Sequence, residues 1–173
     1  MITVEGIDLD LAEDFESGEA SEFALMSAQK ADISIDHRSA VPPSDYGLHF
    51  EGGGQVSGWQ GGPNNTTHDQ AWNENTDFQA SASNCSVDAT GIEGVGLVFD
   101  LRQTYSVGTT YSWFRVLVNG EQVSDINGVS DFNPVTNTDP FVTETFDLSS
   151  YGNSMFSVTL QSAICLLPVR WCF

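Results

Sequence analysis

The stretch from Val95 to Val123, VGLVFDLRQTYSVGTTYSWFRVLVNGEQV, has the clearest structural pattern in the chain. In its first part every second residue is apolar, at Val95, Leu97, Phe99 and Leu101. This period of two predicts a half-buried strand. A second alternating run, Tyr111 to Val118, leads into Asn119-Gly120. Because Asn-Gly accepts the positive φ of a type I′ turn, the stretch predicts an antiparallel ribbon with a hairpin here.

The second run has two different faces. Phe114, Val116 and Val118 share one face, and we expect this face to point into a core. Tyr111, Trp113, Arg115 and Leu117 share the other. A ligand or a covering loop is expected beside Tyr111, Trp113 and Arg115.

The rest of the chain continues in short alternating segments. We expect strands within residues 2–15, 32–36, 46–51, 141–148 and 155–161. Residues 76–89 are expected to be irregular or an edge strand. The Gly- and Asn-rich residues 52–71 are expected to be a long surface loop or a short, glycine-rich strand. Helical periodicity is almost absent, so the pattern predicts an all-β, antiparallel β-sandwich of the jelly-roll, concanavalin-like kind.

Composition limits the partners of this chain. Its 173 residues suit one domain, and 24 acidic residues against five basic ones give a net charge of -19. The negative electrostatic field of such a chain disfavours binding to nucleic acid. No apolar run is long enough for membrane insertion. Calcium binding and a surface charged for solubility both explain the acidity.

The last eleven residues, AICLLPVRWCF, depart from the pattern because they contain no acid and are mostly apolar. We therefore divide the chain into a sandwich domain at 1–162 and an atypical apolar tail at 163–173. The tail is expected to be either an apolar terminal strand or the sign of a sandwich that lacks its last strand, through a truncation or a shifted reading frame.

Several segments carry a family resemblance: DFESG, YGLHFEGG, the long SVDATGIEGVGLVFDLRQTYSVGTTYSWFRVLVNG, FNP and DPFVTETFDLSSYG. Over residues 12–162 they resemble the jelly-roll modules of secreted Bacteroidetes proteins, which are related to cleaved adhesin domains and to MAM domains. The resemblance implies an extracellular or cell-surface, non-catalytic module that often binds calcium. It also implies a Cys85 to Cys165 disulfide and favours Glu16 as a calcium ligand, although the final strand with its acidic pair is missing.

Calcium takes six to eight oxygen ligands. The candidate carboxylates are Asp14, Glu16, Asp32, Asp36 and Asp69, which lie in separate segments and would have to converge. For each carboxylate taken singly, simple exposure on the surface is favoured over a ligand role, by about two to one.

A glycan-binding face is the second candidate site. Its members are Trp59, Trp72, Tyr111, Trp113 and Arg115. Aromatic rings stack on the apolar faces of sugars, but the same rings also suit a core.

Catalysis is the least supported role. Glycoside hydrolysis needs two facing carboxylates, and Glu5 with Asp8, or Asp10 with Glu13, have the wrong parity for one strand face. The sequence thus predicts a calcium-stabilised module for adhesion or glycan binding, with a glycan or surface protein as partner and no enzyme activity. A polysaccharide-active hydrolase or lyase domain and a ligand-free spacer remain alternatives.

Overall fold

The computed structural model describes residues 2–6, 9–20, 22–28, 31–37, 44–52, 79–103, 112–132 and 140–164. In these ranges the chain forms strands and one short 3₁₀ helix, Ser149–Tyr151, so the predicted all-β class is confirmed. The same ranges contain no helix with the length and apolar character needed to cross a membrane. The strands are β1 Ile2–Gly6, β2 Leu9–Glu13, β3 Ala24–Ala28, β4 Ala31–Asp36, β5 Gly47–Gly52, β6 Gln79–Asp88, β7 Gly96–Leu101, β8 Ser112–Val118, β9 Glu121–Val123, β10 Val142–Asp147 and β11 Met155–Ile164.

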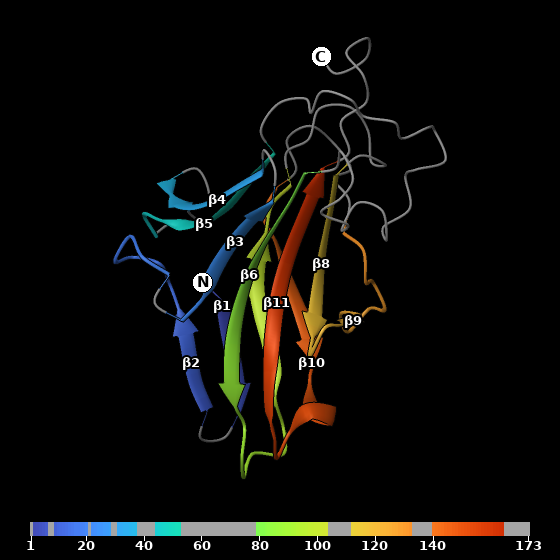
Figure 1. Cartoon of the computed structure of the whole chain (residues 1–173). Helices are drawn as coiled ribbons and strands as arrows, with labels where there is room; N and C mark the ends of the chain where they lie inside the picture. The colour runs from blue at the N-terminus through green and yellow to red at the C-terminus, as the bar shows by residue number, and fades with distance from the viewer. Residues whose placement is uncertain are drawn as a thin grey trace.

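Two antiparallel sheets and a separate strand pair make up the fold (Figure 1). The larger sheet has five strands in the order β3-β6-β11-β8-β9, and the smaller has four in the order β10-β7-β1-β2. In Figure 1, β6, β11 and β8 cross the front of the molecule, while β1 and β10 lie behind them. The remaining pair is β4-β5.

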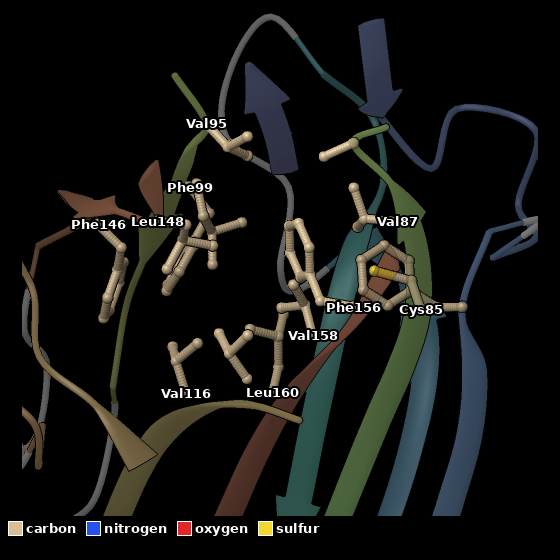
Figure 2. Packing of buried hydrophobic residues seen from close by; sticks show 14 of the residues in the cluster. Cys85, Val87, Val95, Phe99, Val116, Phe146, Leu148, Phe156, Val158 and Leu160 are labelled. Atoms are coloured by element: carbon tan, nitrogen blue, oxygen red, sulfur yellow. The ribbon is translucent and has the colours of Figure 1, made fainter. Parts of the chain in front are cut away.

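The core fills the space between these layers (Figure 2). Because side chains alternate along a strand, each strand contributes every second residue to it. The larger sheet contributes Cys85, Val87, Phe114, Val116, Val118, Phe156, Val158 and Leu160; the smaller sheet and its flanks contribute Val95, Leu97, Phe99, Phe146 and Leu148. The predicted inward faces of both strands of the Val95 to Val123 stretch are therefore confirmed.

Aromatic rings join the layers at one end of this core. Phe99 stacks on Phe146 with ring centroids 5.7 Å apart. Phe114 meets the edges of Phe99 at 5.7 Å and of Phe50, in β5, at 5.8 Å. Since Phe50 contacts the inward residue of β8, the β4-β5 pair lies on the same side of the larger sheet as the smaller sheet does.

The hairpin predicted at Asn119-Gly120 is confirmed, because the two residues have φ of 51° and 82° and join β8 to β9. The single ribbon predicted around it is wrong. β7 belongs to the smaller sheet and β8 to the larger one, so the two strands face each other across the core. The centre of the larger sheet is β11, which pairs with both β6 and β8.

The prediction of an irregular or edge segment at 76–89 is also wrong. β6 spans ten residues and lies between β3 and β11. Its alternation escapes a hydropathy pattern because small and polar residues occupy most of its positions, and only its last part, around Cys85 and Val87, is clearly apolar. At the other end, β11 continues to Ile164, two residues past the expected boundary at 162, and residues 165–173 lie outside the described part.

Candidate functional site

The side of the five-stranded sheet that points away from the core is called here the outer face. In Figure 1 this side faces the viewer, and no described segment crosses in front of β6 and β11. Neighbouring strands are in register, so side chains of the same parity form rows across the sheet. The outer positions with described side chains are Ala24, Asn84, Ser86, Asp88, Arg115, Leu117, Gln122, Met155, Ser157, Thr159 and Gln161.

One row joins β6 to β11. Asn84 lies opposite Thr159 in the register. Its Nδ2 donates a hydrogen bond of 2.7 Å to Thr159 Oγ1. Two polar side chains without charge are therefore fixed side by side on the outer face.

A second, longer network is centred on Arg115 of β8. Arg115 Nε donates to Oε1 of Gln161, the residue opposite it on β11, at 2.9 Å, and a terminal guanidinium nitrogen donates to Gln122 Oε1 at 3.3 Å. Gln122 Nε2 in turn donates to Asp131 Oδ1 at 2.8 Å and to the Ser130 carbonyl at 3.0 Å. A continuous run of amide, guanidinium and carboxylate groups thus crosses three strands.

The structure describes only some of the residues of the predicted glycan site. Arg115 lies on the outer face, as predicted. Trp113 has the same parity in β8 and lies opposite Ala163, but its side chain is outside the described part. Tyr111, Trp59 and Trp72 are outside the described residues.

The predicted calcium ligands Asp14 and Glu16 flank Phe15 in the turn after β2. Phe15 has a φ of 63°, uncommon for a residue with a side chain, and it is buried in the core while its two neighbours are exposed. Asp14 Oδ1 accepts a hydrogen bond of 3.0 Å from the Glu16 N–H. The buried phenylalanine therefore fixes two carboxylates at the surface.

Glu16 connects this turn to the segment before β5. Its Oε1 accepts from the Asp45 N–H at 2.9 Å and from the Tyr46 N–H at 3.3 Å, and its Oε2 accepts from the Asp45 N–H at 3.2 Å. Both oxygens thus already have protein donors. The role that the structure gives to Glu16 is a tie between segments 29 residues apart.

Calcium binding is not supported by a preformed cluster. No group of three or more His, Cys, Asp or Glu side chains is gathered within the described ranges. Asp69 and the side chains of Asp32 and Asp36 lie outside the described part. The described residues alone therefore do not fit a calcium site, and calcium binding stays a prediction.

Asp125 and Glu144 are two carboxylates that influence each other electrostatically and that the sequence pattern did not predict as a site. Asp125 is only 7% exposed, and its carboxylate accepts from the Asn127 N–H at 2.9 Å, the Val129 N–H at 2.6 Å and Asn127 Nδ2 at 3.0 Å. Burial alone would raise the pKa of Asp125, but these hydrogen bonds outweigh it and hold the pKa below its usual value. Its carboxylate is therefore ionised and engaged within its own turn.

Glu144 of β10 has the same parity as the buried Phe146, so it lies on the inward side of the smaller sheet. The Ile126 N–H donates to the Thr145 carbonyl at 2.9 Å, which brings the Asp125 turn against β10. Burial, and then the charge of Asp125, raise the pKa of Glu144. The two carboxylates thus have pKa values shifted in opposite directions.

The disulfide implied by the resemblance is not formed in this structure. Cys85 is a free, buried thiol, and burial raises its pKa to about 11. The strand register gives the reason, since Cys85 lies opposite Val158 while Ile164, the last described residue of β11, lies opposite Gln79. Cys165 itself is outside the described residues.

Comparisons of the chain with protein-family models, with curated proteins and with solved structures found no match.

Proposed function

We propose that this chain is a non-catalytic, extracellular binding module that uses the outer face of the five-stranded sheet to bind a glycan. The observation that carries the proposal is the network of Arg115, Gln161 and Gln122, in which planar amide and guanidinium groups are held in place across three strands. Sites for polar ligands use a few polar groups with fixed orientation, and sugar hydroxyls both donate and accept hydrogen bonds. The extracellular location rests on the resemblance to adhesin modules, and the choice of glycan over surface protein rests on the aromatic residues predicted beside Arg115.

The chemistry of the outer face favours binding over hydrolysis. Glycoside hydrolysis requires two carboxylates on either side of the scissile bond, one of them able to donate a proton. Asp131 is the carboxylate that joins the described network, and its Oδ1 accepts from Gln122. A set of amides and one guanidinium can orient a sugar but supplies no acid and base pair.

A polysaccharide-active hydrolase is the second candidate, and one observation favours it. Asp125 and Glu144 have pKa values shifted apart, as the acid and base of a catalytic pair do. Asp125, however, already accepts three hydrogen bonds from its own turn. Release of reducing sugar that depends on Glu144 would establish this alternative in place of the binding module.

The binding proposal is tested with a glycan array and calorimetry on the full chain. We expect wild type to bind a glycan without turnover, and Arg115→Ala or Gln161→Ala to lower its affinity roughly tenfold or more, because each removes hydrogen-bonding groups from the face. Trp113→Ala tests the predicted aromatic platform. Ser150→Ala is the matched control, since Ser150 is exposed but lies in the 3₁₀ helix.

Unchanged affinity in both the Arg115 and the Gln161 variants would exclude the outer face as the site. If wild type neither binds a glycan in the array nor acts on soluble polysaccharides, the ligand-free spacer is favoured instead.

The calcium prediction has its own test. A metal that binds only the folded state stabilises it by RT ln(1 + [L]/Kd), about 2.7 kcal/mol at a hundredfold excess over Kd. A calcium site that uses Glu16 predicts that a chelator lowers the Tm of wild type and leaves that of Glu16→Gln unchanged. An unchanged Tm of wild type in chelator would refute calcium binding.

A further inference from the structure

The chain contains two Asn-Gly dipeptides in neighbouring turns, Asn119-Gly120 and Asn127-Gly128. Both follow a β-branched residue, Val118 or Ile126, and both asparagines are exposed. Their glycines have nearly equal φ values of 82° and 83°. The two sites therefore share the same intrinsic chemistry, and any difference between them comes from the surrounding structure.

The chemistry of interest is asparagine deamidation, one reason why Asn is regarded as thermolabile. The backbone nitrogen of the glycine attacks Cγ of the asparagine and forms a new N–Cγ bond. The Cγ–Nδ2 bond breaks, and Nδ2 leaves as ammonia with the proton that the glycine nitrogen gave up. Water then opens the resulting succinimide at either carbonyl, which gives aspartate or isoaspartate without any change of oxidation state.

At Asn119 the structure favours this reaction. The Ser157 N–H donates to Asn119 Oδ1 at 2.9 Å, so a donor already faces the oxygen that becomes negative when Cγ is attacked. The attacking nitrogen, Gly120 N, has no hydrogen bond within the described ranges. The turn joins β8 to the three-residue strand β9, and such a short terminal pairing opens easily.

At Asn127 the structure opposes both the attack on Cγ and the loss of ammonia. The Gly128 N–H, which must attack, donates to the Asp125 carbonyl at 3.0 Å. Asn127 Nδ2, which must leave, donates to Asp125 Oδ2 at 3.0 Å. The ionised Asp125 carboxylate also repels the negative charge that would form on the neighbouring amide oxygen.

We propose that Asn119 is a site of spontaneous deamidation in the folded protein, whereas Asn127, in the same dipeptide, is protected by Asp125. Isoaspartate at position 119 inserts a methylene into the backbone of a type I′ turn. This turn connects Arg115 on β8 with Gln122 on β9, which are bonded at 3.3 Å. Ageing at Asn119 would therefore disturb the Arg115 network of the outer face.

The test follows both sites in the same molecule. The full-length folded chain is incubated in mildly alkaline buffer, digested under acidic conditions, and analysed by mass spectrometry that separates asparagine, aspartate and isoaspartate peptides. We expect conversion at Asn127 to be roughly tenfold slower than at Asn119, because two hydrogen bonds must first be broken there. In denaturant the two rates should become similar.

Conversion at Asn127 as fast as at Asn119 in the folded chain, or a stable Asn119, would overturn the proposal. Asp125→Ala provides the second measurement, with Asn119 as the internal reference. We expect this variant to speed conversion at Asn127 and to leave the rate at Asn119 unchanged. If the variant is unfolded by circular dichroism, the comparison of folded and denatured wild type decides the matter.

Discussion

The two faces of the five-stranded sheet share one backbone and differ in what most of their side chains do. On the inner face, Val116, Val158 and Leu160 are 0%, 0% and 2% exposed. One residue away on the same strands, Arg115, Thr159 and Gln161 are half-buried and bonded across the sheet. Burial of an apolar side chain contributes about 1.5–3 kcal/mol, whereas one hydrogen bond contributes about 1 kcal/mol. The inner face therefore carries stability, and the outer face is free to be specialised for binding.

The sharpest test compares the neighbours Phe114 and Arg115. Phe114 is 4% exposed and contacts the rings of Phe50, Phe99 and Phe132, so Phe114→Ala should lower the free energy of unfolding by roughly 3–5 kcal/mol. Arg115→Ala should cost far less stability and act mainly on binding. Urea unfolding of both variants measures the contrast, and equal losses would mean that the faces are not separate in function.

Replacing Asp125 tests whether a buried polar side chain can also stabilise the fold. Asp125→Ala leaves the N–H groups of Asn127 and Val129 without their charged acceptor, so we expect a loss of about 1–3 kcal/mol. Because folding lowers the pKa of Asp125, its contribution should be complete above the ordinary value of about 4 and disappear as the pH falls through the lower folded value. Urea midpoints of variant and wild type at several pH values check this, and a constant difference at all pH values would contradict it.

Asn84→Ala should have a smaller effect. It removes one hydrogen bond, to Thr159, from a partly solvated surface, and the expected loss is about 0.5–1.5 kcal/mol. A double-mutant cycle with Thr159→Ala isolates the pair. A coupling energy near zero would show that the outer-face rows add nothing to stability.

Replacement of Glu144 should raise the stability of the folded state slightly. Burial and the charge of Asp125 raise its pKa in the folded state, so its ionisation opposes folding at neutral pH. Glu144→Gln should therefore raise the urea midpoint at neutral pH, and the gain should vanish below about pH 4, where the carboxyl is protonated in both states. A gain that persists in acid would point to packing rather than charge.

Local patterns predicted the features that depend on adjacent residues. The inward faces of β7, β8 and β11 follow from alternation, and the turn at Asn119-Gly120 follows from its two residues. The buried Asp125 had a local signal as well, since an aspartate before Asn-Gly often accepts backbone N–H groups. Glu144 also had one, because it occupies an inward position two residues before Phe146.

Long-range pairing could not be predicted in the same way. The network of Arg115 exists because Gln161 lies opposite it, 46 residues later in the chain. Nothing in either segment encodes that register locally, since many registers keep the apolar residues inside. The assignment of β7 and β8 to different sheets has the same origin.

The central position of β11 also bears on how the protein is made. β6 and β8 are both paired to β11 and not to each other, so the five-stranded sheet cannot close before residues 155–164 have left the ribosome. Sheets built from pairings so distant in sequence fold slowly, and their unpaired strands are prone to aggregate meanwhile. Assembly of the outer face is therefore a late step of folding, and the strands that β11 pairs with stay exposed to wrong partners until it has been made.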